Sequence, residues 1–87
     1  MLMKNFINYY YNLSILKIRK SSDNYYFEIN GIEYEFVTCF DNEQSLLYRY
    51  FLTNKSNRYT HEIIYNINNS IYTYYNNVPY ILIKKNF

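Results

Sequence analysis

The sequence predicts an α+β domain in which an antiparallel sheet of five to six strands is covered by one helix, with a short N-terminal helix packed alongside. Three observations support this prediction: an Asn-Gly pair between two alternating apolar runs, a later stretch with helical spacing, and further strand-like runs after it. The chain has 87 residues, so residues 1–87 are expected to form a single domain with a modest core.

The first part of the chain predicts a helix and then a strand. Apolar residues recur at i, i+3, i+4 and i+7 within Leu2–Tyr11, which is one stripe of a short helix. The following residues alternate, because Leu16 and Ile18 are separated by a basic residue. This alternation is typical of a half-buried strand, which we place at Ser14–Lys20.

The next stretch, Asn24–Cys39, predicts a β-hairpin. Asn30 and Gly31 favour a type I′ turn, because both central residues of that turn need positive φ. A two-residue loop pairs Ile29 with Ile32, and a shift by one residue would mix the two faces. The predicted apolar face consists of Tyr25, Phe27, Ile29, Ile32, Tyr34 and Phe36, and the opposite face of Glu28, Glu33, Glu35 and Tyr26.

A second helix is expected over Asn42–Leu52. Asp41 and Gln44 have the spacing of a capping box, and apolar residues then recur at helical intervals. Residues 53–60 are polar and are predicted to form a loop.

The last third predicts strands again, at His61–Asn66, at Ser70–Tyr75 and from Pro79 onward. Asn76 and Asn77 tolerate left-handed geometry and therefore suit the turn before the last strand. That strand is the most apolar and is expected to be the most buried. The predicted core consists of Leu16, Ile18, Phe27, Ile29, Tyr34, Phe36, Leu47, Phe51, Ile63, Ile81 and Ile83.

Composition excludes several classes of protein. The formal charge of +2 is too small to imply a nucleic-acid or membrane partner. The apolar runs are too short for a transmembrane helix. Lys4 and Asn5 lie where a signal peptide would need its apolar core. The single Cys39 suits a reducing compartment, so a cytoplasmic protein is expected. We attribute the 23% aromatic content to codons of an AT-rich genome.

No group of residues predicts a particular chemistry. His61 and Cys39 are too few for a metal site and would need an orienting third group to act as a nucleophilic pair. We interpret Cys39 as a small apolar residue, His61 as structural or surface-exposed, and Glu43 as a charge at a helix N-terminus. The hairpin glutamates are expected to pair with Lys17 and Arg19. No catalytic, cofactor-binding or metal-ligating residue is predicted.

The order helix, three-strand meander, helix, further strands resembles the N-terminal lobe of protein-kinase-like phosphotransferases. More specifically, the chain resembles spore-coat kinase-like proteins of low-GC Gram-positive bacteria, in the aminoglycoside-phosphotransferase superfamily. The likeness covers Tyr10–Lys85 and is carried by the stretches YYFEINGIEYEF, DNEQSLLYRYF and HEIIYNINNSIYTYYNNVPYILIKK. It rests on element order and turn spacing.

Departures from this family imply a loss of activity. The Lys that active relatives carry on the third strand falls near Phe36 here, and no Lys occurs between Lys20 and Lys55. Gly31 is the only glycine, so a Gly-rich phosphate loop is missing. The catalytic residues of such enzymes lie in a C-terminal lobe, which this sequence does not contain. The resemblance therefore implies a pseudokinase-like lobe that is not itself an enzyme and has no cofactor, from a truncated frame or a gene fragment.

Three functions remain open. The first is a non-catalytic N-lobe-like domain whose partner is a missing C-terminal lobe. The second is a free-standing module that binds another protein through its sheet edge or helix face. The third, less favoured because of the hairpin glutamates and the low charge, is a single-stranded nucleic-acid binder that uses its tyrosines and lysines.

Overall fold

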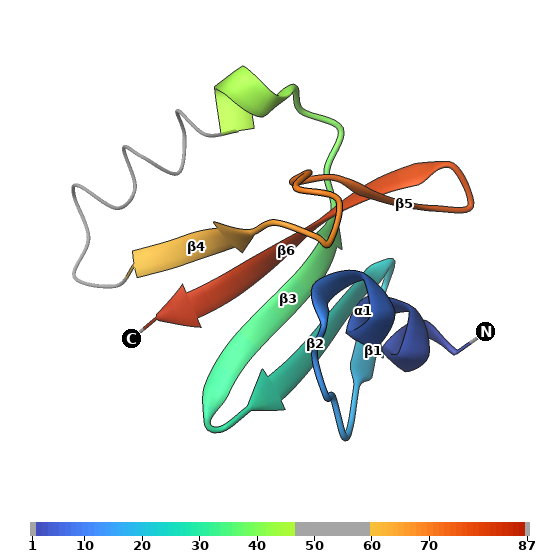
Figure 1. Cartoon of the computed structure of the whole chain (residues 1–87), viewed down its shortest axis with the longest axis vertical. Helices are drawn as coiled ribbons and strands as arrows, with labels where there is room; N and C mark the ends of the chain where they lie inside the picture. Colours follow the sequence, from blue (N-terminus) through green and yellow to red (C-terminus); the bar gives the residue numbers. More distant parts are fainter. Residues whose placement is uncertain (1, 47–59, 87) are drawn as a thin grey trace.

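The computed structural model describes residues 2–46 and 60–86, which form an α+β fold. A six-stranded antiparallel sheet is combined with a short N-terminal helix and the beginning of a second helical segment (Figure 1). The elements are α1 (Met3–Tyr11), β1 (Arg19–Ser21), β2 (Asn24–Ile29), β3 (Ile32–Thr38), β4 (Thr60–Ile64), β5 (Thr73–Tyr75) and β6 (Val78–Asn86).

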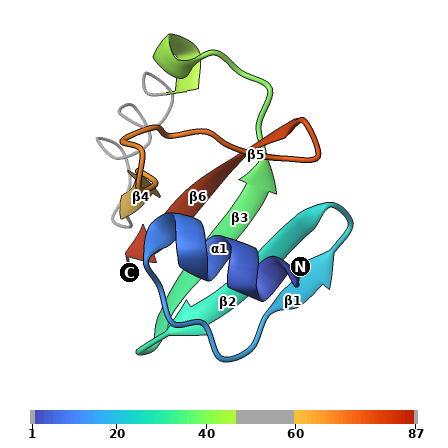
Figure 2. The same cartoon turned by 45° about the vertical axis from the view of Figure 1, so that its right-hand side comes forward.

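The sheet has the order β1-β2-β3-β6-β4, and β5 pairs with the first residues of β6. β6, the last strand, therefore lies between β3 and β4. The chain thus forms β4 at one edge of the sheet before β6 fills the place beside β3. β1 and β4 are at the two edges of this path. In Figures 1 and 2, α1 lies across the part of the sheet formed by β2 and β3.

Two tight hairpins follow the predicted turn chemistry. Asn30 and Gly31 have φ of 52° and 80°, and Ile29 pairs with Ile32, so the predicted register of β2 and β3 is confirmed. Asn76 and Asn77 have φ of 50° and 64° and connect β5 to β6. Asn and Gly occupy these positions because other residues adopt left-handed geometry at a greater cost.

The apolar face of the hairpin packs against α1. The helix begins at Met3 and ends at Tyr11, where Asn12 takes a left-handed conformation with φ 53°. Phe36 is fully buried under the helix, and its ring stacks on Tyr80 with 4.6 Å between centroids. Burial of such a side chain contributes about 1.5–3 kcal/mol. We call this cluster the α1-side core; its buried members are Phe6, Ile7, Tyr11, Ile15, Phe27, Phe36, Tyr80 and Leu82.

A second cluster lies on the other face of the sheet. Side chains alternate along β6, so Leu82 joins the α1-side core while its neighbours point to the opposite face. We call this second cluster the far-side core; its buried members are Cys39, Leu46, Ile71, Ile81 and Ile83. The run Tyr80–Ile83 is buried throughout, which confirms that the last strand is the most buried one.

The segment before β1 differs from the prediction. Only Arg19–Ser21 forms a strand, and Leu16, predicted to be in the core, is 85% exposed. Ile15 is buried in its place, with its N–H donating to Asn8 Oδ1 at 2.8 Å. The prediction was wrong because the chain leaves α1 as an irregular segment, so strand alternation does not apply there.

The second helical segment begins where it was predicted. Residues 43–46 are helical, and Asn42 provides the cap, because its Oδ1 accepts a hydrogen bond from the Ser45 N–H at 2.8 Å. The predicted capping residue, Asp41, lies one position earlier. The remainder of the predicted helix, with Leu47 and Phe51, lies outside the described residues.

Other parts of the prediction are close to the structure. β4 ends at Ile64 and β5 begins at Thr73, so both are shorter than predicted. Of the predicted core, Phe27, Phe36, Ile81 and Ile83 are buried. Four further members are only partly buried: Ile18, Ile29, Tyr34 and Ile63.

Candidate functional site

A charged cluster lies on the sheet face opposite α1. Lys85 of β6 forms an ion pair with Glu35 and lies 3.8 Å from Glu33 Oε2. Glu33 is directly opposite Lys85 in the strand register, which explains this pairing. Such partly exposed ion pairs contribute about 0–1 kcal/mol. Lys85 therefore offsets one of the two negative charges, and the cluster does not by itself indicate catalysis.

The predicted ion-pair partners of these glutamates were wrong. Lys17 and Arg19 make no ion pair with them among the described residues. The physical reason is that Lys17 lies before β1, while the second neighbour of β3 is β6, which brings Lys85 alongside.

A groove of about 630 Å³ adjoins the charged cluster. Its lining includes the polar residues Glu35, Asp41 and His61 and the apolar residues Ile81 and Ile83. Cys39 also lines it, so the structure brings Cys39 and His61 to one groove. Within the described parts of the chain, however, no three His, Cys, Asp or Glu side chains are grouped closely enough to hold a metal ion.

Cys39 has the environment of a structural residue. Its side chain is 8% exposed and packs in the far-side core with Leu46 and Ile71, and its N–H donates to the Pro79 carbonyl at 3.0 Å. This agrees with its interpretation as a small apolar side chain. A nucleophilic thiol would need access to substrate and a nearby base.

Phe36 and the second helical segment lie on opposite faces of the sheet. The ring of Phe36 contacts Phe6 and Tyr11 of α1, at centroid distances of 6.4 and 5.9 Å. Residues 43–46 reach the other face, because Leu46 packs in the far-side core. Glu43 is exposed in that helical turn, which agrees with a charge at a helix N-terminus.

A buried polar network connects α1 to the segment before β5. The Tyr11 hydroxyl lies 2.7 Å from Thr73 Oγ1, and Asn66 Nδ2 donates to the same Oγ1 at 2.9 Å. Asn66 Oδ1 accepts hydrogen bonds from the N–H groups of Asn68 and Ser70, at 2.9 and 3.1 Å. The Asn66 amide is thus satisfied on both sides, so this network holds the loop. The sequence gives no signal for it, because Tyr11 and Thr73 are 62 residues apart.

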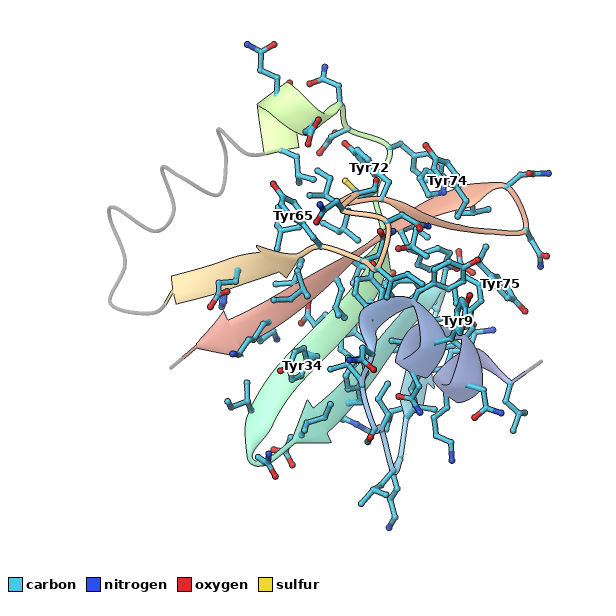
Figure 3. The ribbon with its side chains drawn as sticks, viewed as in Figure 1. Tyr9, Tyr34, Tyr65, Tyr72, Tyr74 and Tyr75 are labelled. Carbon is cyan, nitrogen blue, oxygen red and sulfur yellow. The ribbon has the colours of Figure 1, made fainter. Side chains whose placement is uncertain are left out.

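The tyrosines are spread over the molecule. Tyr11 and Tyr80 are buried, and Tyr34 stacks on Phe27 at 5.2 Å between centroids. Figure 3 shows Tyr34 over the sheet but Tyr72 near the second helical segment, so these two rings do not share one surface. Burial raises the pKa of Tyr11 to about 12, and the hydrogen bond with Thr73 opposes this shift.

Basic residues gather at the β1 edge of the sheet. Lys17 lies just before β1, which contains Arg19 and Lys20, and all three are exposed. The Lys20 ammonium lies 5.8 Å from the centroid of the Tyr25 ring, a cation–π distance. Among the described residues, none of the three forms an ion pair.

No helix within the described ranges is long and apolar enough to cross a membrane. No family model matches the chain, and no curated protein or solved structure is significantly similar to it.

Proposed function

We propose that this chain is a non-catalytic domain with the layout of a kinase N-terminal lobe, from a spore-coat kinase-like protein, and that it does not bind nucleotide. The order of the described elements supports this proposal: a short helix, the β1-β2-β3 meander, a helical segment beginning at residue 43, and further strands. The domain then acts through a partner, either a C-terminal lobe or another protein, in the cytoplasm.

The proposal that nucleotide binding is lost depends on the environment of Phe36. This position, near the strand Lys of active relatives, is occupied by a fully buried ring between α1 and Tyr80. An ammonium group there would lose its hydration inside an apolar core, which is costly without a charged partner. The surroundings of Phe36 therefore suit an aromatic side chain rather than a phosphate-binding Lys.

The test is a thermal melt of this chain with and without millimolar ATP and Mg²⁺. A ligand at 100 times its Kd stabilises the folded state by about 2.7 kcal/mol, which a melt detects readily. We expect no rise in Tm. A rise that ATP causes and an equal concentration of sodium phosphate does not cause would contradict the loss of nucleotide binding.

The family relationship needs a separate test. Sequencing of the DNA beyond the Phe87 codon shows whether the frame continues into a lobe with an Asp-bearing catalytic loop. Such a lobe is the expected result. A stop codon immediately after Phe87 would rule out a C-terminal lobe in the same frame as the partner and would favour the second candidate function.

That second candidate is a small protein-interaction module. The open edge at β1 favours it, because β1 is the first strand of the sheet and all three of its residues are exposed. An unpaired edge strand is a template for another chain.

A further inference from the structure

We propose that the β1 edge binds an extended, acidic segment of a partner protein by strand addition. This inference deepens the second candidate function, and it does not depend on the loss of nucleotide binding. It rests on three features of the edge: its backbone, its charges and an exposed leucine.

The backbone of β1 offers hydrogen-bonding groups at the open edge. β1 and β2 are connected by the two residues Ser22 and Asp23, and Ser21 pairs with Asn24. In such a hairpin the closing pair is hydrogen-bonded and the next pair is not. Lys20, opposite Tyr25, is in that next pair. Its N–H and C=O therefore point away from β2, toward the side where an added strand would lie.

The charges at this edge select the partner. Lys17, Arg19 and Lys20 are exposed, and within the described chain none of them forms an ion pair. Arg19 lies opposite Tyr26 and Lys20 opposite Tyr25, so the two cations are on opposite faces of the sheet. A carboxylate on either face of an added strand would therefore have a cation beside it, and opposite charges on adjacent strands attract. A second copy of the same edge would bring like charges together. The edge therefore disfavours self-pairing and favours an acidic segment.

Leu16 adds an apolar contact to the same edge. Leu16 is 85% exposed and lines a groove of about 450 Å³ together with Lys17, Arg19 and residues of the β2–β3 hairpin. The hairpin contributes Glu28 and Glu33 to this groove, and Lys85, which lies near Glu33, also pairs with Glu35, so the carboxylates of a partner are expected beside Lys17 and Arg19 and not beside the hairpin. Residues 16–18 precede β1 and are not part of a strand, so a partner covers Leu16 only if it extends past β1. We therefore expect the partner to carry apolar as well as acidic residues.

The test uses a synthetic peptide that alternates Glu with Val and is about ten residues long, the upper range of a strand. Binding is followed by backbone amide chemical shifts of the isotope-labelled full chain. We expect the shifts to concentrate at residues 16–21, and the affinity to fall as salt rises, because exposed charges are screened. The same peptide with Lys in place of Glu should not bind.

Two sets of variants separate charge from backbone. Lys17→Glu with Arg19→Glu should weaken binding by about tenfold, the effect of roughly 1.4 kcal/mol. Lys4→Glu with Lys84→Glu makes the same change in net charge away from the edge and should leave binding intact. Lys20→Pro removes the outward N–H as well as the charge, so it should weaken binding more than Lys20→Ala does. Thermal melts confirm that each variant is folded.

Three results would overturn the proposal. The first is no binding by the Glu-Val peptide at millimolar concentration. The second is binding that both charge reversal at the edge and Lys20→Pro leave unchanged. The third is a different occupant: a concentration-dependent dimer whose amide shifts map to β1 would identify a second copy, and equal binding of oligothymidine at residues 16–21 would identify a general polyanion site. None of these results bears on ATP binding.

Discussion

At the scale of single residues, Tyr11 carries a buried polar group that the fold supplies with a partner. Its hydroxyl is buried against Thr73 Oγ1, and Thr73 also receives the Asn66 amide. A neutral hydroxyl is tolerated there because it is hydrogen-bonded, but a phenolate would be desolvated inside the α1-side core. This is the physical reason that burial raises the Tyr11 pKa to about 12.

The Tyr11 pKa predicts a loss of stability at high pH. Well below pH 10.0 both folded and unfolded Tyr11 are protonated, so the group adds no pH dependence. Between 10.0 and about 12 the unfolded chain ionises first, so the free energy of unfolding falls as pH rises. Two pKa units correspond to about 3 kcal/mol. The free energy of unfolding of Tyr11→Phe, measured by urea titration, should therefore fall less steeply across this pH range than that of the parent protein.

A control variant makes the Tyr11 prediction specific. Tyr11→Phe also removes a buried hydrogen bond, so it should lower stability at neutral pH by about 1 kcal/mol. Tyr9→Phe removes the hydroxyl of a side chain that is 64% exposed and should change neutral stability little. Identical pH profiles for the parent and Tyr11→Phe would contradict the assignment of the loss to Tyr11.

At the scale of elements, the β2–β3 hairpin depends on its turn. Gly31 has φ +80°, and a Cβ added there would meet no atom within 4 Å. Gly31→Ala should therefore lower the free energy of unfolding by about 1–2 kcal/mol, and backbone strain should be the only cause. Asn30→Gly keeps access to positive φ and is the matched control. Urea midpoints measure both; equal midpoints for Gly31→Ala and the parent would contradict a strained turn.

The sequence could predict this hairpin because its signal is local. Asn30 and Gly31 determine the turn, the turn determines the register, and the alternating pattern then assigns the faces. The segment before β1 lacked such a constraint. Its alternation predicted a buried Leu16, but the contact between Ile15 and Asn8 of α1 decides which residue is buried there.

The candidate sites were less predictable, because they depend on contacts between distant residues. Cys39 and His61 reach one groove only because β6 lies between β3 and β4. Lys85 pairs with Glu35 for the same reason. The β1 edge was predicted only in general terms, since its exposure follows from the short length of β1 and from its place at the end of the sheet.

At the scale of the whole molecule, β6 connects the two cores. Tyr80 and Leu82 belong to the α1-side core, and the residues that alternate with them, Ile81 and Ile83, belong to the far-side core. β6 also pairs with β3, β4 and β5. Neither core can lose its packing without disturbing this strand, so the described fold should unfold as one cooperative unit.

Two matched substitutions test this cooperativity. Ile7 and Ile81 are 0% and 2% exposed, in the α1-side and far-side cores respectively. Ile7→Val and Ile81→Val should each lower the free energy of unfolding by about 0.5–1.5 kcal/mol. β6 belongs to both cores. In each variant, the urea midpoint measured by circular dichroism and the midpoint measured by tyrosine fluorescence should therefore shift by the same amount.

Ile67→Val is the control, since Ile67 is 50% exposed and its truncation should have little effect. If Ile7→Val instead separated the two transitions, α1 and its core would unfold independently of the far side. Equal shifts in both variants would mean that the strands whose residues enter both cores, β3 and β6, join the two faces of the described fold into one folding unit.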